Sequence, residues 1–268
     1  MFSVLISVYT KEQPEYLQCA LFSIWDSQTL KPNQIVIVLD GPLSEELNEI
    51  IIKWKNRLDP VVTIVPIKEN VGLGAALNIG LTHCKYELVA RMDTDDISHP
   101  HRFQKQVSFM NDNEDITASS AQTEEWDETL KVKLNQRNLP LKADKIKIFA
   151  KRRSPLSHPV TIFRKSDILS VGGYPPLRKA QDYALWSVLL VHEKKLANLP
   201  DFLLKMRTGG GLLDRRGWSY FKYELKLLSF QREIGFLPFS YFISNVMLKA
   251  GLRLAPKWVK DFLYKVFR

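Results

Sequence analysis

Short apolar runs alternate with helical patterns through the first hundred residues, and this alternation constrains the fold more than any other feature of the sequence. Apolar periodicity predicts strands at 2–8, 34–39, 61–67 and 87–92, with helices at 16–25, 44–54 and 74–83. Ser44 can cap the second of these helices. Strand–helix–strand units of this kind favour a mostly parallel sheet with right-handed crossovers. We therefore expect an α/β fold. If the strand order is 3-2-1-4, strands two and four flank strand one.

The alternation breaks down after residue 100, which indicates a mixed second half. Strands are predicted at 116–122, 130–134 and 160–164, and helices at 102–110, 142–150, 165–170 and 182–192. Gly209, Gly210 and Gly211 are expected to form a flexible joint. The sequence thus divides into a domain at 1–208, with halves at 1–98 and 99–208, and a basic aromatic helical region at 209–268.

The net charge of +9 is unevenly distributed. The segments 129–153 and 215–268 each carry +8, which leaves −7 on the remainder. This division suggests an anionic partner on one face and a cation-binding or acid–base site elsewhere. For the segment 129–153, a solvated lysine-rich face is an equally open interpretation.

Several classes of protein are disfavoured. Cys19 and Cys84 form neither a disulfide framework nor a zinc pattern, so a reducing compartment fits best. The N-terminal apolar run has the pattern of a core strand rather than a signal peptide. The longest uncharged run, between Glu233 and Lys249, is shorter than the roughly 20 apolar residues of a spanning helix. We find no nucleic-acid recognition motif and expect no nucleic-acid partner.

Acidic residues follow two of the predicted strands. Asp93 and Asp95 come directly after the fourth strand, and Asp40 ends the second. Open α/β sheets bind their ligands beyond the carboxyl ends of the strands, where these residues converge. Paired carboxylates at such a place bind Mg²⁺ or Mn²⁺ together with substrate phosphates. A solvated turn or a helix cap is the alternative.

A glycine loop at 70–74 follows the third strand rather than the first, and Leu77 stands where a dinucleotide-binding motif has its third glycine. The phosphate-binding G-K-[ST] motif is also absent. Gly72 and Gly74 would permit a helix N-terminus to approach a nucleotide closely, and simple turn chemistry explains them equally well.

Two further polar residues are ambiguous from the pattern alone. Asp182 opens a predicted helix, where an aspartate usually serves only as a cap. His158 precedes a proline and a strand, which favours a structural role.

Seven segments, in this order and at these spacings, carry a resemblance to a known family: ISVYT, IVIVLDGP, NVGLGAALNIGL, ELVARMDTDDISHPHRFQKQ, SHPVTIFRKSDI, GGYP and AQDYALW. Together they resemble the family 2 glycosyltransferases of bacterial exopolysaccharide, capsule and O-antigen synthesis, over residues 2 to 208. The resemblance implies a GT-A (Rossmann-like) fold, with a mixed central sheet flanked by helices, and inverting, metal-dependent transfer from a nucleotide-diphosphate sugar.

The resemblance also implies roles for single residues. Asp182 would be the general base, which overturns the structural interpretation, and Asp95 and Asp93 would bind Mg²⁺ or Mn²⁺. The donor would be held by Ser7, Val8, Tyr9, Thr10, Asp40, Gly72, Asn78, Arg91 and Asp93. Arg91 and His158 would chiefly shape the site. UDP is the expected donor base because it is the commonest in the family.

This sequence departs from the family pattern at several positions. Thr10 replaces the usual Asn, Leu39 and Pro42 replace residues of the D-D-G-S turn, Leu77 replaces an Arg, and Gln181 replaces a Glu. The segment 208–210 stands where many relatives carry a His near the metal. The D-x-D pair and the base are retained.

The segment 256–268 divides apolar and basic residues between two helical faces. Such a helix lies on an anionic membrane surface, packs on the catalytic domain, or forms a dimer contact, and we favour the membrane. A lipid-linked saccharide acceptor and a peripheral location on the cytoplasmic face of the cell membrane would fit. The alternatives to a glycosyltransferase are a sugar nucleotidyltransferase, whose phosphate loop is absent, and a non-catalytic scaffold, which would not need the three aspartates.

Overall fold

The computed structural model describes residues 1–208 and 218–254. Its centre is a nine-stranded sheet in the order β3-β2-β1-β4-β8-β6-β9-β5, with β7 paired to β6. The first four strands are parallel and comprise β1 (Phe2–Val8), β2 (Gln34–Asp40), β3 (Val62–Ile67) and β4 (Leu88–Met92). The order 3-2-1-4, which the sequence left as a condition, is the one observed, and the C-terminal ends of these strands lie at one edge.

The second half adds strands of mixed direction: β5 (Ile97–Ser98), β6 (Ile116–Trp126), β7 (Lys133–Arg137), β8 (Ile162–Arg164) and β9 (Lys195–Arg207). The sequence did not indicate β5 or β9, and it placed the β7 segment at 130–134. Pro200 interrupts β9, and strand pairing with β6 shifts register between Ala121 and Gln122 at this point. Because proline cannot donate to a ladder, β9 accommodates it at this irregularity, which hid the strand from pattern analysis.

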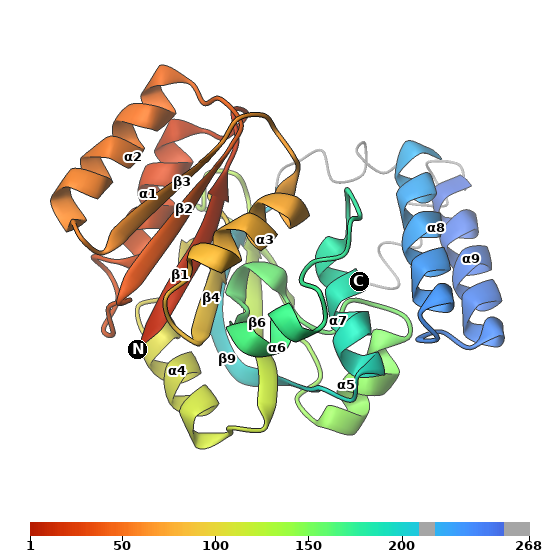
Figure 1. Cartoon of the computed structure of the whole chain (residues 1–268). Helices are drawn as coiled ribbons and strands as arrows, with labels where there is room; N and C mark the ends of the chain where they lie inside the picture. The colour runs from red at the N-terminus through yellow and green to blue at the C-terminus, as the bar shows by residue number, and fades with distance from the viewer. Residues whose placement is uncertain (209–217, 255–268) are drawn as a thin grey trace.

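Helices cover both faces of the sheet (Figure 1). One face packs against α1 (Pro14–Ile24), α2 (Glu45–Leu58) and α4 (Arg102–Asp112). The other packs against α3 (Leu73–His83), α6 (Lys165–Ser170) and α7 (Gln181–Val191). Ser44 caps α2 as predicted, since its hydroxyl accepts a hydrogen bond of 3.4 Å from the Leu47 amide. The fold is the expected mixed sheet flanked by helices.

A helical hairpin of α8 (Trp218–Glu233) and α9 (Phe239–Leu254) lies beyond α5 (Ala143–Ala150) and α7, at the end of the molecule opposite α2 (Figure 1). Leu228, Phe236 and Leu237 pack against Ala150. Arg152 donates hydrogen bonds to Asn245 at 2.8 Å and to Ser244 at 2.7 Å. Contacts from the end of the basic segment 129–153 thus hold this hairpin against the rest of the structure.

No helix within residues 1–208 and 218–254 is long and apolar enough to cross a membrane. The predicted joint at 209–211 and the predicted two-faced helix at 256–268 lie outside the described residues.

Candidate functional site

An acidic cluster occupies the turn between β4 and β5, at the edge where the parallel strands end. Asp93, Asp95 and Asp96 each offer a carboxylate oxygen, and these oxygens lie within 4.8 Å of one another. Asp93 and Asp95 are partly exposed, whereas Asp96 is buried. All three donors are hard oxygen ligands, so the cluster is suited to Mg²⁺ or Mn²⁺. Asp96 was not among the predicted ligands, although its place beside Asp95 was a signal for it.

Burial and mutual repulsion perturb the acids of this acidic cluster. Burial, followed by the charge of Asp93, raises the pKa of Asp95 to about 6. The same two causes and the charge of Asp95 raise the pKa of Asp96 well above its ordinary value. The buried Arg91 guanidinium contacts Asp93 and supplies a compensating positive charge. The site therefore concentrates negative charge that a divalent cation would stabilise.

Glu12, in the loop after β1, is a fourth acid beside the acidic cluster, and sequence analysis missed it. Burial raises its pKa to about 7, and the charges of Asp95 and Asp93 act in the same direction. A hydrogen bond with the Thr94 side chain opposes this rise. Contact between the β1–α1 loop and the β4–β5 turn follows from the parallel pairing of β1 with β4.

The predicted donor-binding residues after β1 lie at the same edge of the sheet. Ser7 is partly buried and Val8 is buried, while Tyr9 and Thr10 are exposed. Ile6 pairs with Met92, directly before the acidic cluster. The structure thus brings the β1 segment and the cluster together.

Asp40 holds the glycine loop. Its carboxylate accepts hydrogen bonds from the Val71 amide at 2.7 Å, the Gly72 amide at 3.1 Å and the Asn70 side chain at 3.0 Å. Gly72 has a φ of +87°, a conformation that favours glycine. Asp40 therefore positions the start of α3, and its contact with a nucleoside stays a prediction.

Asn78 on α3 fastens the Gly-Gly-Tyr-Pro turn. Its amide donates to the Tyr174 carbonyl at 2.9 Å, and its carbonyl accepts from the Tyr174 amide at 2.7 Å. The Tyr174 hydroxyl in turn lies 2.9 Å from Nε2 of the buried His158. Burial and the charge of Arg91 keep the pKa of His158 well below its usual range, so this imidazole is neutral. Donor contact by Asn78 stays a prediction.

Asp182 lies in the first turn of α7. The helix begins at Gln181, one residue before the predicted start, and its N-cap is Ala180, with a φ of 58°, so Asp182 is not the cap that the pattern alone suggested. Burial raises the pKa of Asp182, against hydrogen bonding from the Tyr183 backbone and the charge of Arg137. Arg137, on β7, is a site residue that sequence analysis missed because it lies within the basic segment 129–153.

Arg91 connects the acidic cluster to Asp182. Its guanidinium contacts Asp93, and its charge lowers the pKa of both Asp95 and Asp182. The charge of Arg207, at the end of β9, also lowers the pKa of Asp95. The guanidinium carbon of Arg207 lies 4.0 Å from the centroid of the Tyr16 ring. The charge of one buried guanidinium thus reaches both the predicted metal ligands and the predicted base.

A comparison with known protein families identifies the chain. The sequence profile of glycosyl transferase family 2 matches residues 3–170, more than half of the chain. The chain belongs to this family. The match covers the acidic cluster and the glycine loop and ends before α7.

Relatives of this family 2 glycosyltransferase match over nearly the whole chain. It is 43% identical to the amylovoran biosynthesis glycosyltransferase AmsE of Erwinia amylovora, over 99% of this chain and 98% of that protein. It is 34% identical to the UDP-Gal:alpha-D-GlcNAc-diphosphoundecaprenol beta-1,3-galactosyltransferase of Escherichia coli, over 98% and 95%. An O-antigen biosynthesis glycosyltransferase of Escherichia coli, WbnJ, is 30% identical over 93% and 97%.

Solved structures share the fold of this glycosyltransferase. The mannosyltransferase PcManGT of Pyrobaculum calidifontis, in complex with GDP-Man and Mn²⁺, superposes with a TM-score of 0.68 at 15% identity, over 93% of this chain and 69% of that one. Residues 1–349 of TarS of S. aureus, in complex with UDP-GlcNAc, superpose with a TM-score of 0.66 at 16% identity, over 93% and 72%. The GT-A fold is confirmed.

The chain is therefore a glycosyltransferase, as the resemblance implied, and the nucleotidyltransferase and scaffold alternatives are not supported. The roles of the individual site residues stay predictions.

Proposed function

We propose that this glycosyltransferase transfers one sugar, with inversion, from a UDP-sugar to a hydroxyl of a lipid-linked saccharide in exopolysaccharide or O-antigen synthesis. The observation that carries the proposal is the acidic cluster, whose three carboxylates converge within 4.8 Å of one another beside the buried Arg91. Inverting transfer needs one group that neutralises the leaving diphosphate and one group that accepts a proton from the acceptor hydroxyl.

The acidic cluster fits a divalent cation by its chemistry. Its three carboxylates converge within 4.8 Å, and burial raises the pKa values of Asp95 and Asp96, so a bound cation would relieve unfavourable charge. Asp93 and Asp95 would hold Mg²⁺ or Mn²⁺, and the buried Asp96 would complete or support the site. The cation would supply positive charge to the diphosphate of the donor. The complex of PcManGT with GDP-Man and Mn²⁺ is consistent with this.

Asp182 would act as the general base. Its carboxylate would take the proton of the acceptor hydroxyl while the hydroxyl oxygen forms a bond to the anomeric carbon. The bond from that carbon to the diphosphate oxygen breaks, and UDP leaves with its electron pair. Because burial raises the pKa of Asp182, its carboxylate would be a stronger base than a solvated aspartate.

The donor would lie between the ends of β1 and β4, held by Ser7, Val8, Tyr9, Thr10, Asp40, Gly72, Asn78, Arg91 and Asp93. Solved neighbours hold UDP-GlcNAc in one case and GDP-Man in another, so the fold alone does not select the base. The Escherichia coli galactosyltransferase is named for a UDP-Gal donor and a diphosphoundecaprenol-linked acceptor, which supports both assignments.

An exposed apolar stripe on α9 supports peripheral attachment to the cytoplasmic face of the cell membrane. Phe239, Ile243 and Met247 are spaced four residues apart on one helix face, and 63% of Phe239 and 69% of Met247 are exposed. The adjacent face of α9 packs inward through Phe242 and Val246. Apolar side chains on a basic hairpin suit the interface of an anionic membrane.

A donor and acceptor screen tests the proposal. We expect transfer from UDP-sugars to a saccharide–diphosphate–lipid when Mg²⁺ or Mn²⁺ is present. NMR of the product should show that the anomeric configuration of the transferred sugar is inverted. EDTA should abolish the reaction. Transfer from GDP-sugars or dTDP-sugars alone would contradict the donor assignment, and retained configuration would contradict the mechanism.

A further inference from the structure

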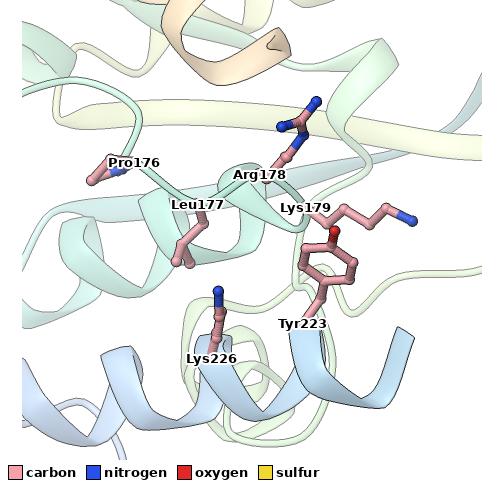
Figure 2. Close-up of a pocket in the computed structure, with 6 residues that line it drawn as sticks. All are labelled: Pro176, Leu177, Arg178, Lys179, Tyr223 and Lys226. Carbon is pink, nitrogen blue, oxygen red and sulfur yellow. The ribbon is translucent and has the colours of Figure 1, made fainter. Parts of the chain in front are cut away.

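A basic pocket of about 130 Å³ opens between the loop that precedes α7 and the side of α8 (Figure 2). Its walls contain three cationic side chains and one phenol, and it is lined by Pro176, Leu177, Arg178, Lys179, Tyr223 and Lys226. Lys226 extends from α8 toward the loop, and Tyr223 lies beside Lys179, while Arg178 points to the side of the loop away from α8 (Figure 2). Neither the acidic cluster nor the proposed base belongs to this basic pocket.

The described part of the chain provides no ion pair for the cations of the basic pocket. Within residues 1–208 and 218–254, no carboxylate forms a salt bridge with Arg178, Lys179 or Lys226. Glu224, the acid nearest in sequence on α8, is already paired with Lys249 at 3.1 Å and Arg253 at 2.8 Å. Clustered like charges in a concave site raise the local concentration of anions.

The walls of the basic pocket are held in place. Leu177 and Ala180 of the loop pack on Tyr183 and Leu227, which joins the loop, α7 and α8 in one apolar cluster. Gln231 of α8 donates a hydrogen bond of 2.7 Å to the Ser187 hydroxyl of α7. The Lys179 ammonium lies 5.0 Å from the Tyr223 ring centroid. Such contacts preorganise a site and reduce the entropy cost of binding.

The position of the basic pocket favours the acceptor over the donor. Lys179 precedes Asp182 by three residues, so their Cα atoms are separated by at most about 11 Å. In an in-line displacement, the base stands on the acceptor side of the anomeric carbon and the leaving diphosphate stands opposite. The donor diphosphate is assigned to the acidic cluster, so a second phosphate-binding site beside the base suits the acceptor.

We propose that this basic pocket binds the diphosphate that joins the acceptor saccharide to its lipid. Lys179 and Lys226 would pair with the phosphate oxygens, and the Tyr223 hydroxyl would donate a hydrogen bond. The anchored diphosphate would place the acceptor hydroxyl at Asp182. This inference rests on the lipid-diphosphate acceptor of the proposed function, and it assigns the recognition of that acceptor to α8 and the loop before α7.

Steady-state transfer to two acceptors tests the inference. One acceptor is a sugar–diphosphate–alkyl compound, and the other is the same sugar as an alkyl glycoside without the diphosphate. We expect Lys179→Gln and Lys226→Gln each to raise KM for the diphosphate acceptor about ten-fold or more, since each removes a charge-assisted contact. In each variant, the preference for the diphosphate acceptor over the alkyl glycoside should fall by the same factor relative to the wild-type enzyme. Lys222→Gln, an exposed lysine of α8 outside the basic pocket, should keep the wild-type preference.

The outcomes separate the basic pocket from the proposed function. A wild-type enzyme without any preference for the diphosphate acceptor would refute the acceptor class and the role of the basic pocket together. A wild-type preference that survives Lys179→Gln and Lys226→Gln would refute the basic pocket alone. A rise in donor KM at unchanged acceptor KM would assign the basic pocket to the donor. Loss of binding to phosphatidylglycerol vesicles at unchanged acceptor KM would assign it to a phospholipid head group. Either of the last two results overturns the inference.

Discussion

The backbone amide of Arg207 donates a hydrogen bond of 3.0 Å to Oδ1 of Asp96, across 111 residues of sequence. This bond joins the last residue of β9 to the acidic cluster after β4. The neighbouring strand pair β5–β9, in which Ile97 pairs with Lys205, makes the same junction. Asp96 thus has a structural role that is separate from any role as a metal ligand.

Asp96→Ala should destabilise the protein by about 1–3 kcal/mol, because it leaves the Arg207 amide without its acceptor. Asp96→Asn retains an oxygen acceptor and removes negative charge from the acidic cluster, so its stability in metal-free buffer should stay close to wild type. Urea unfolding of both variants measures the difference. Equal stability of the two variants would contradict the structural role.

Metal-free stability should depend on pH through Asp95. Its folded-state pKa of about 6 exceeds its ordinary value of 3.8, so the native state binds the proton more tightly than the unfolded state. The stabilising effect of this proton is complete below pH 4 and is lost as pH rises through 6. His158, whose pKa is lowered, acts in the opposite direction, so the test compares two proteins.

In EDTA, the difference in melting temperature between Asp95→Asn and the wild type should shift in favour of the variant as pH rises from 5 to 8. The reason is that the variant has no carboxylate at position 95 to become charged and repel the neighbouring acids. Added Mn²⁺ should stabilise the wild type more at pH 8 than at pH 5, where protons compete for the carboxylates. A difference between the proteins that does not change with pH would argue against the raised pKa.

Asp182→Asn should lower the transfer rate by about two to four orders of magnitude and leave donor affinity unchanged, since a general base acts in the chemical step. Because Ala180 is the N-cap, Asp182→Ala removes no cap, and the loss of the hydrogen bond between the carboxylate and the Tyr183 backbone should cost about 0.5–1.5 kcal/mol. Rates and melting curves should find both variants folded and inactive. An active Asn variant would leave the base unidentified.

Arg137→Gln should shift the pH dependence of transfer. The charge of Arg137 lowers the pKa of Asp182, so its removal raises that pKa and keeps the base protonated to higher pH. The acidic limb of the kcat/KM profile should therefore move to higher pH, with the largest loss of activity at low pH. Lys142→Gln, an exposed lysine of the same basic segment, is the control and should leave the profile in place.

Replacement of the apolar stripe on α9 should weaken membrane attachment. Phe239→Ser combined with Met247→Ser removes two exposed apolar side chains from the hairpin, so flotation with phosphatidylglycerol vesicles should fall. Ile148→Ser, which changes a 66% exposed residue of α5, should float as the wild type does. Equal flotation of the double variant and the wild type would exclude the stripe from membrane binding.

Local patterns in the sequence predicted the first half of the fold well. Period and turn chemistry identified β1 to β4, the Ser44 cap of α2 and the position of the D-x-D pair after β4. These features depend on residues that are close in sequence, or on the general rule for right-handed crossovers. Recognition of the seven motifs supplied the family.

The second half was predicted less well because its structure depends on pairing between distant residues. β9 is hidden by Pro200 and is stabilised by β6, about 80 residues earlier, through a ladder that shifts register around the proline. Ala180, rather than Asp182, is the N-cap because the loop before α7 is held by packing on α8. No local pattern contains either fact.

The sequence by itself determined the α/β class and the carboxylates that could carry the chemistry. Only the tertiary structure decided which charges meet: Asp96 with the Arg207 amide, Glu12 with the acidic cluster, Asp182 with Arg137, and Lys179 with α8. The reason is physical. Secondary structure follows from the periodicity of neighbouring residues, whereas a pKa or a binding pocket depends on burial and on charges that the folded chain brings together from distant segments.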